Sequence, residues 1–510
     1  MWGIRLCAEF SFWARALCSL SYSSLHLRYE STKETDMTSV VYPKKIVEQK
    51  NIKDSYRLFE KRDLTVGVVE GDYITVDKSG GFIVLDFGKE MCGGIRILTA
   101  LIPSESKTGK IRLRFGESLS EVYAELGEKN TTNDHAPRDF DYVICGHSDL
   151  KIGDTGYRFV RIDFYPCDAD ILLKTIVGTN TILKMPCKYR YQGEDKRIKK
   201  IFDTAKRTLD LCSGSSWVWD GIKRDRLVWI GDLYPEILSL CTMYGRVGAV
   251  EKSLDFERRR HKYKGKWMCS LSTYNMWWVI CVCEYYFMTG AKDFLDKQMG
   301  YLAEQIELFN ESVGENGELK YECLYVDWPT MDHEDKIIGS RFINIIAAKK
   351  AKELYTRLGL DTAEIDRLLA KLMMSDMKVK EKKQVIGLKY YALGSITDED
   401  YALLIKDGAS GLSTFMSYFI LGAIASRDKE LAIKIMKDYY GAMLDKGATT
   451  FWEDFDIEWT IGSGRIDRLP KPGEKDIHGD FGKYCYKGFR HSLCHAWSSG
   501  VIKFIEEYCK

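Results

Sequence analysis

Residues 220–232, DGIKRDRLVWIGD, concentrate side chains that can do chemistry more densely than any other stretch of the chain. They include three carboxylates, three cations and a tryptophan. Two carboxylates in different surroundings can act as acid and base, a guanidinium group orients hydroxyls or carboxylates, and an indole offers a flat face to a pyranose. The stretch therefore suggests the floor of a sugar site. The structural alternative is an interhelical loop whose Asp and Arg side chains cap helix ends and pair with one another.

Four further stretches in the C-terminal half gather aromatic side chains, three of them together with acidic or imidazole groups. They read STYNMWW at 272–278, YVDWPTMDHED at 325–335, TTFWEDFDIEW at 449–459 and GFRHSLCHAWSSG at 488–500. Loops at one end of a helical barrel converge, so residues far apart in the sequence can meet around one ligand. Trp277 and Trp278 are neighbours on a predicted helix, so at most one of them can face such a ligand.

Residues 42–186 have the pattern of β-strands separated by turns rich in Gly, Lys and Asp. In GKIRLRFG, Ile111, Leu113 and Phe115 alternate with two arginines, which predicts a half-buried strand with one wet face. Several such strands without a helical pattern between them predict a β-sandwich. The loop at 130–142 is either a solvated connection or a segment that reaches over a neighbouring pocket.

The periodicity of apolar residues changes from two to 3.6 near residue 194. The apolar residues of the next segment fall on one stripe, as a helix packed on a core requires: Ile198, Ile201, Phe202, Ala205, Leu209 and Cys212. About twelve helical patterns in consecutive hairpins favour an (α/α)6 toroid over a generic helical bundle. No fixed repeat of about 34 or 40 residues occurs, which argues against a solenoid.

We therefore predict a multidomain chain in three parts. Residues 1–41 form an N-terminal extension that is disordered or an artefact of an upstream start, because translation from Met37 would omit most of it. Residues 42–190 form the β-sandwich domain. Residues 191–510 form an (α/α)6 barrel that carries the catalytic site.

The composition argues against several classes of function. The chain has 75 Lys plus Arg against 74 Asp plus Glu, so no overall basic field recruits nucleic acid or an anionic membrane. No run of about eighteen apolar residues occurs, so no membrane span is expected. The 15 cysteines include no CxxC pair, which indicates free thiols in a reducing, cytoplasmic compartment. We expect a carbohydrate substrate, no metal and no cofactor, and we leave a homo-oligomer open.

The motifs together resemble those of the bacterial α-L-rhamnosidase family. With its flanks, the first stretch is similar to the family pattern Asp, three residues, then Arg-Asp-Glu-Arg-Leu-Gly-Trp-Thr-Gly-Asp. TTFWE at 449–453 matches the family's Thr-Thr-x-Trp-Glu, and SLCH at 492–495 replaces Ser-x-Asn-His, with Cys494 for Asn. Val326-Asp327-Trp328 takes the place of Gly-Asp-Trp. These motifs follow the family order over nearly the whole chain from the predicted sandwich onward.

The resemblance implies a short, single-sandwich member of the six-hairpin glycosidases, which cleaves terminal α-L-rhamnosides with inversion. By this resemblance Asp225 takes the position of the acid, and Glu453 takes that of the base. Further residues would hold sugar hydroxyls or form walls: Asp220, Arg224, Asp232 and His495 for the hydroxyls, and Trp229, Trp328 and Trp452 for the walls.

The chain departs from the family where the acid should stand. Arg224-Asp225-Arg226-Leu227 is one residue shorter than Arg-Asp-Glu-Arg-Leu, so the acid is an aspartate, which reaches less far than glutamate. Alternatively, Asp225 matches the family's preceding Asp, and Glu236 or another carboxylate has taken over, or catalysis has been lost. The alternative functions are hydrolysis of a fucoside, glucoside or uronide on the same fold, or carbohydrate binding without catalysis.

Overall fold

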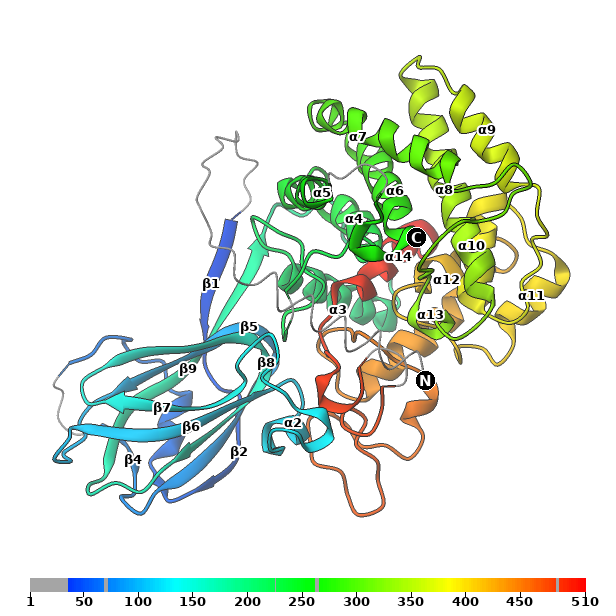
Figure 1. Cartoon of the computed structure of the whole chain (residues 1–510). Coiled ribbons are helices and arrows are strands. Elements are labelled where there is room, and N and C mark those ends of the chain that lie inside the picture. Colours follow the sequence, from blue (N-terminus) through cyan, green and yellow to red (C-terminus); the bar gives the residue numbers. More distant parts are fainter. Residues whose placement is uncertain (1–34, 68–71, 225, 262–265, 483–485) are drawn as a thin grey trace. The chain divides into compact units, whose positions relative to one another are not determined.

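The computed structural model of the chain describes residues 35–67, 72–224, 226–261, 266–482 and 486–510 (Figure 1). These residues belong to one compact unit, Glu34–Lys510, in which strands come first and helices follow. The order of an N-terminal sheet region and a helical region is therefore as predicted. Most of the predicted extension at 1–41 lies outside the described residues; its last part, Thr35–Val41, is strand β1.

Within the described ranges, nine strands form one antiparallel sheet in the order β3-β4-β9-β5-β8-β6-β7, with β1 paired to β9 and β2 paired to β5. Their bounds are β1 (Thr35–Val41), β2 (Lys45–Lys50), β3 (Ile52–Lys53), β4 (Ile74–Val76), β5 (Gly81–Thr99), β6 (Thr108–Gly116), β7 (Asp139–Cys145), β8 (Asp149–Phe164) and β9 (Ile171–Lys184). The pairing of β5 with β8 shifts register between Asp86 and Met91 and again between Gly93 and Ile95. Such irregularities bend a strand and increase its twist.

Strand β6 has the predicted alternation of buried and more exposed residues except at Arg114. Ile111, Leu113 and Phe115 are buried in the core of the sheet region, as predicted. Arg114 was expected on the wet face but is buried. Its guanidinium group pairs with Asp163 of the neighbouring strand β8 at 2.9 Å, and this ion pair lets an arginine occupy a covered position.

The helical region contains twelve α-helices among the residues described, in agreement with the number predicted. Their bounds are α3 (Lys196–Cys212), α4 (Leu233–Tyr244), α5 (Gly248–Arg260), α6 (Ser272–Thr289), α7 (Lys292–Glu311), α8 (Asp335–Arg357), α9 (Ala363–Leu372), α10 (Lys383–Leu393), α11 (Asp398–Ile405), α12 (Ser417–Ala425), α13 (Lys429–Asp445) and α14 (Val501–Tyr508). A short helix, α2 (Leu119–Tyr123), precedes them in the sheet region. The predicted stripe of α3 is buried throughout. No helix within the described ranges is long and apolar enough to cross a membrane.

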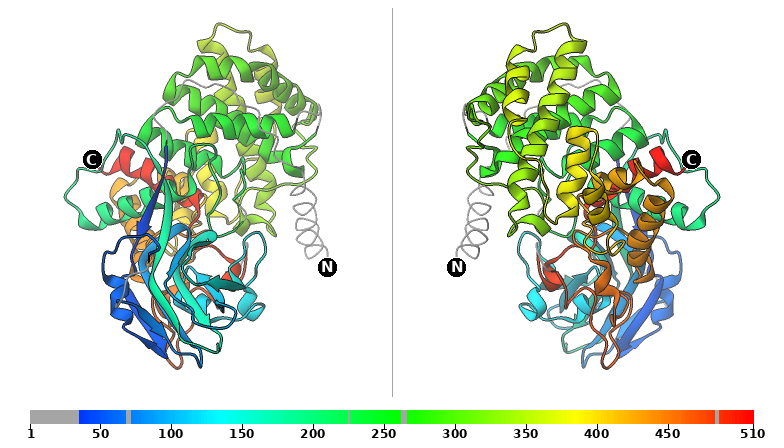
Figure 2. Two further views of the ribbon diagram at one scale, coloured as in Figure 1. Left: turned by 90° about the vertical axis from the view of Figure 1, so that its left-hand side faces the viewer. Right: turned by 90° about the vertical axis from the view of Figure 1, so that its right-hand side faces the viewer.

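From α4 onward, alternate helices of the chain pack against one another. Helices α4, α6, α8, α10 and α12 are neighbours in that order, and α14 contacts both α12 and α4; Figure 2 shows the same helices from two sides. Trp277 and Trp278 of α6 are fully buried on different sides of the helix. Trp277 packs against Tyr234 and Phe419, whereas Trp278 packs against Tyr301.

Hydrogen bonds join the sheet region to the loops of the helical region that hold the predicted site. Thr155 Oγ1 donates to Lys223 O at 2.7 Å, and Glu90 N donates to Thr449 Oγ1 at 2.9 Å. Both acceptors lie within a few residues of a predicted catalytic carboxylate. The sheet therefore supports the site directly.

Candidate active site

The segment 220–232 connects α3 to α4 and lies against the segment that precedes α14. Asp220 O accepts a hydrogen bond from Ala496 N at 2.7 Å, and Gly221 forms an isolated antiparallel bridge with His495. Two of the predicted motifs, far apart in the sequence, are thus neighbours in the backbone.

Glu453 lies in the loop after α13, and only 4% of its surface is exposed. Arg224 Nη2 donates to both of its carboxylate oxygens, at 3.0 and 2.8 Å. Ser492 N donates to Oε2 at 2.9 Å, and Glu453 N donates to Ser492 O at 3.0 Å. Arginine and amide donors stabilise the negative charge of a carboxylate, which suits a general base.

The C-terminal segment also holds Arg224 in place. Its Nε donates to Arg490 O at 2.8 Å, and its guanidinium carbon lies 3.8 Å from the ring centroid of Tyr486. A cation over an aromatic face is an attractive contact. Tyr486 belongs to no recognisable motif and was not predicted, whereas Arg490 lies in the stretch 488–500 but was assigned no role there.

Three more buried carboxyl groups, those of Asp220, Asp232 and Glu236, belong to the same electrostatic group as Glu453. Burial raises the pKa of each well above its ordinary value, and neighbouring carboxylates raise it further. The charge of Glu453 acts on Asp232, and that of Asp232 acts on both Asp220 and Glu236. Asp220, Asp232 and Glu236 therefore retain protons at a pH where exposed carboxylates are ionised.

Asp327 is a further buried carboxyl group beside this set. Burial raises its pKa to about 7, although hydrogen bonds from Ser413 and from the backbone N–H of Trp328 lower it. The residue also caps the 3-10 helix Trp328–Thr330 through a reciprocal bond with Thr330. It thereby fixes the position of Trp328.

His495 is buried beside Asp232, with 3.9 Å between Nε2 and Oδ1. Burial lowers the pKa of the imidazole to about 4, and the charge of Glu453 only partly offsets this. The ring packs on Trp497 with 4.3 Å between centroids. At neutral pH this imidazole is uncharged and can both donate and accept a hydrogen bond.

Two predicted wall residues belong to one row of aromatic rings. Trp229, Tyr274, Tyr325 and Trp328 contact one another in series, edge to face, with centroid distances of 6.1, 6.1 and 5.3 Å. Trp229 and Trp328 are half-buried, so each keeps exposed ring surface. Trp452 is different, since it is fully buried against Phe455. Its indole has no exposed face for a sugar.

Asp225, the predicted acid, lies outside the described residues, so its separation from Glu453 is not defined. Hydrogen bonds hold the residues on either side of it. Arg226 N donates to Arg224 O at 2.7 Å, and the Arg226 guanidinium group forms two hydrogen bonds with Asp154 of β8, at 2.8 and 3.0 Å.

The segment 130–142 reaches the site, which was one of its two predicted alternatives, although its last four residues belong to strand β7 and not to a loop. Arg490 Nη2 donates to Asp134 Oδ2 at 2.8 Å. A cavity of about 10 Å³, the size of one water molecule, lies between this loop and Arg224. The loop thus covers one side of the Arg224 and Glu453 pair.

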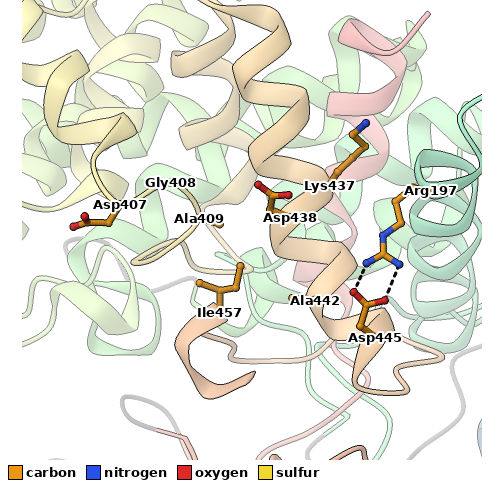
Figure 3. Close-up of a pocket in the computed structure, with 9 residues that line it drawn as sticks. All are labelled: Arg197, Asp407, Gly408, Ala409, Lys437, Asp438, Ala442, Asp445 and Ile457. Atoms are coloured by element: carbon orange, nitrogen blue, oxygen red, sulfur yellow. Dashed lines mark hydrogen bonds and ion pairs between the residues drawn. The ribbon is translucent and has the colours of Figure 1, made fainter. Parts of the chain in front are cut away.

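A larger cavity, of about 600 Å³, lies elsewhere, beside α13 and the start of α3 (Figure 3). It is lined by Arg197, Asp407, Gly408, Ala409, Lys437, Asp438, Ala442, Asp445 and Ile457. Arg197 and Asp445 pair across it at 2.5 Å, as Figure 3 shows. None of the predicted site residues lines this cavity.

Two groups in the described part of the chain have side chains close enough together to hold a metal ion. They are Glu257, His261 and Cys269, and Glu117, Glu121 and His478. Neither group includes a predicted site residue. Lys223 Nζ lies 2.8 Å from Glu121 Oε1, so a cation already neutralises the second group.

No protein-family model matches the sequence, and no curated protein is significantly similar to it. Solved structures are similar in fold. A rhamnosidase from Klebsiella oxytoca with rhamnose bound superposes with a TM-score of 0.72 and 19% identity, over 94% of this chain and 97% of that one.

Two longer structures are also similar. The α-L-rhamnosidase from Dictyoglumus thermophilum has a TM-score of 0.63 and 15% identity, over 94% of this chain and 52% of its own. The α-L-rhamnosidase from Streptomyces avermitilis complexed with L-rhamnose has a TM-score of 0.61 and 16% identity, over 83% of this chain and 42% of its own. This chain spans about half the length of these two proteins. The likeness to α-L-rhamnosidases that the motifs indicated is confirmed, and the chain has their fold.

Proposed function

We propose that the protein is a glycoside hydrolase that cleaves terminal α-L-rhamnosides. The observation that carries this proposal is the buried Glu453 carboxylate, held by Arg224 and Ser492 N among carboxyl groups that retain protons. A site that combines a stabilised carboxylate with protonated carboxyl groups has the two ingredients of acid–base glycoside hydrolysis. The fold shared with rhamnosidases makes a rhamnoside the best-supported substrate.

In the proposed reaction, Asp225 donates a proton to the glycosidic oxygen and the aglycone leaves. Glu453 takes a proton from a water molecule that attacks the anomeric carbon from the opposite face. The sugar is therefore released with inverted configuration. This geometry needs roughly 6.5 to 9.5 Å between the two carboxyl groups, which leaves room for the water.

We assign the remaining predicted residues as follows. Asp232 and His495 hold sugar hydroxyls, and Trp229 and Trp328 form the wall of the sugar site. Asp220 shapes the loop, because its Oδ1 accepts hydrogen bonds from Gly221 N and Leu227 N, at 2.8 and 3.0 Å. Since Trp452 is fully buried, we assign it a supporting place behind Glu453.

We also propose the finer architecture expected from the sequence, with a β-sandwich domain at 42–190, to which strand β1 adds, and an (α/α)6 barrel at 191–510. The serial packing of α4, α6, α8, α10 and α12, with α14 beside both ends of the series, supports an inner ring of helices. The cysteines in the described ranges are free thiols, which supports a reducing compartment such as the cytoplasm.

The test is hydrolysis of aryl α-L-rhamnosides by the wild type and by Glu453→Gln. Loss of the base should lower kcat by about 1,000-fold, since acid–base groups typically contribute 100- to 10,000-fold. Glu251→Gln is a matched control, because Glu251 is also buried and accepts two hydrogen bonds from an arginine, at 2.6 and 3.2 Å from Arg246. This control should keep its kcat within about twofold.

Azide tests the role of Glu453 more directly, since it attacks without losing a proton to a base. Glu453→Ala should regain turnover in azide and form a β-L-rhamnosyl azide, which NMR identifies. A panel of aryl fucosides, glucosides and uronides tests the other substrates. If the wild type cleaves none of these glycosides, the proposal fails. Sugar binding in calorimetry without turnover would then favour the alternative of a non-catalytic carbohydrate-binding protein.

A further inference from the structure

We propose that Glu117, a residue of the sheet region, is a positioning residue for the base Glu453. Glu117 follows strand β6 and is fully buried. It acts through the segment 488–495, which supplies the backbone N–H that holds Glu453. This inference rests on the proposed function, because it assigns a role relative to the base of that reaction.

The carboxylate of Glu117 binds two consecutive residues of the segment. Its Oε2 accepts from Leu493 N at 2.6 Å, and its Oε1 accepts from Ser492 Oγ at 3.1 Å. Ser492 N, on the other side of the same residue, donates to Glu453 Oε2 at 2.9 Å. One residue thus connects the two glutamates, and a shift of Ser492 moves the donor that orients the base.

Lys223 fixes the same segment from a second direction. Its Nζ donates to the carbonyl oxygens of Phe489 and of His491, the latter at 2.9 Å. It also lies 3.5 Å from Glu117 Oε2. The next residue in the chain, Arg224, binds Glu453 itself. Lys223 therefore holds the segment 488–495, and Arg224 holds the base Glu453.

His478 completes the support of the segment. Its Nε2 lies 2.9 Å from His491 O, and its Nδ1 lies 2.8 Å from the hydroxyl of Ser118, the residue after Glu117. Every group of this network is buried, so water cannot replace a lost partner. The sheet region therefore determines where Ser492 N points.

Loss of the contacts that Glu117 makes with the segment 488–495 should slow the chemical step more than it weakens sugar binding. A displacement of about 1 Å can cost a reaction about 100-fold, because the base must stay within hydrogen-bond reach of the attacking water. Glutamine in place of Glu117 keeps the volume but loses the negative charge. It also offers only one acceptor oxygen to the two donors of Ser492 and Leu493.

The experiment compares Glu117→Gln with Asp86→Asn in the full chain. Asp86 is a matched control, since it is a buried carboxylate of the same sheet and forms two hydrogen bonds of 2.9 Å with Arg158. Arg158 also reaches the helical region, through Gly447 O at 3.3 Å, but it does not contact the segment 488–495. We expect Glu117→Gln to lower kcat on an aryl α-L-rhamnoside about 100-fold with KM within about threefold. Asp86→Asn should change kcat by less than about threefold.

Hydrogen exchange of the segment gives a readout that needs no substrate. The amides of 488–495 should exchange at least about tenfold faster in Glu117→Gln than in the wild type, and they should be unchanged in Asp86→Asn. Ser492→Ala removes the hydroxyl that contacts Glu117 and the backbone of Cys494, but keeps the bond between Glu117 and Leu493 N, and should lower kcat about tenfold.

The outcomes separate the two proposals. A wild type without glycosidase activity defeats the proposed function, and the exchange rates still decide whether Glu117 holds the segment. If the wild type is active but Glu117→Gln matches Asp86→Asn in both kcat and exchange, the positioning role is refuted. Equal losses of kcat in the two variants would also refute it, since they would reflect stability alone.

Discussion

Two groups of buried carboxyl groups lie close together in this protein and have opposite electrostatic surroundings. In the helical region, burial raises the pKa of Asp220 and of Glu236, Asp232 raises both further, and Asp220 also raises that of Glu236. In the sheet region, Glu121 lies 2.8 Å from Lys223 Nζ and 3.5 Å from Arg138 Nε. Burial and neighbouring carboxyl groups dominate in the first group, although Arg224 lowers the pKa of Asp220, whereas a carboxylate paired with cations holds structure together through its charge. The first arrangement suits proton transfer, and the second suits support.

The motif Lys223-Arg224 links the two groups. Lys223 faces the carboxylates of the sheet region, and Arg224 faces Glu453. The two side chains are adjacent in the chain but contact different carboxylates, so one short stretch serves both groups. Each prediction below changes one side of this comparison.

The largest expected loss of activity follows from removing the proposed general acid, Asp225. Asp225→Asn should lower kcat about 1,000-fold on rhamnosides with poor leaving groups, because these need protonation of the departing oxygen. On a dinitrophenyl rhamnoside, whose leaving group needs no proton, the loss should be less than about tenfold. Rates measured across a series of aryl leaving groups give this dependence. Equal losses on all members would exclude Asp225 as the acid and favour Glu236.

The second prediction applies the same substitution to both groups. Glu121→Gln removes a buried negative charge that faces both Lys223 and Arg138 and should reduce the free energy of unfolding by about 3 kcal/mol. Glu236→Gln replaces a carboxyl group that is already protonated and should change this free energy by less than about 1 kcal/mol. Urea denaturation measures both values. Similar losses in the two variants would mean that Glu236 is ionised, and the comparison would fail.

The sequence predicted the strands and helices well, because apolar residues recur clearly every two residues in the first region and every 3.6 residues in the second. The burial of Ile198, Ile201 and Leu209 on α3 follows directly from a 3.6-residue pattern. Arg114 shows the limit of this reasoning. Alternation placed it on a wet face, but a carboxylate on the neighbouring strand covers it, and strand pairing cannot be derived from one strand alone.

Asp220, Arg224, Glu453 and His495, which the motifs selected, are buried in connected segments, and their roles stay predictions. Glu117 could not be predicted. Its partner Ser492 is 375 residues away, and a single glutamate in a turn belongs to no pattern. Trp452 lies in a motif, yet a motif gives residue order and not the direction of a side chain. Its complete burial therefore depends on the packing of Phe455 and other distant residues.

The smallest expected effect concerns Glu117. This residue belongs to the sheet region, but its pKa is raised, like those of the carboxyl groups in the helical region. Burial raises the pKa of Glu117 to about 7, and Lys223 lowers it only in part. Between the unfolded value near 4.5 and this value, the folded protein binds more protons than the unfolded chain. The stability that this carboxyl group contributes is therefore complete at low pH and is lost as the pH rises through about 7.

Glu117→Gln cannot titrate at this position, so its melting temperature relative to the wild type should rise by about 1 to 3 °C from pH 5 to pH 8. The other groups that face Glu117, namely Lys223, Glu121, Glu90 and His478, are present in both proteins, so their own titrations largely cancel in the difference. A constant or falling difference would mean that Lys223 keeps Glu117 ionised throughout. A rising difference would mean that ionised Glu117 is tolerated at a cost to stability, as expected for a group retained because it orients the base.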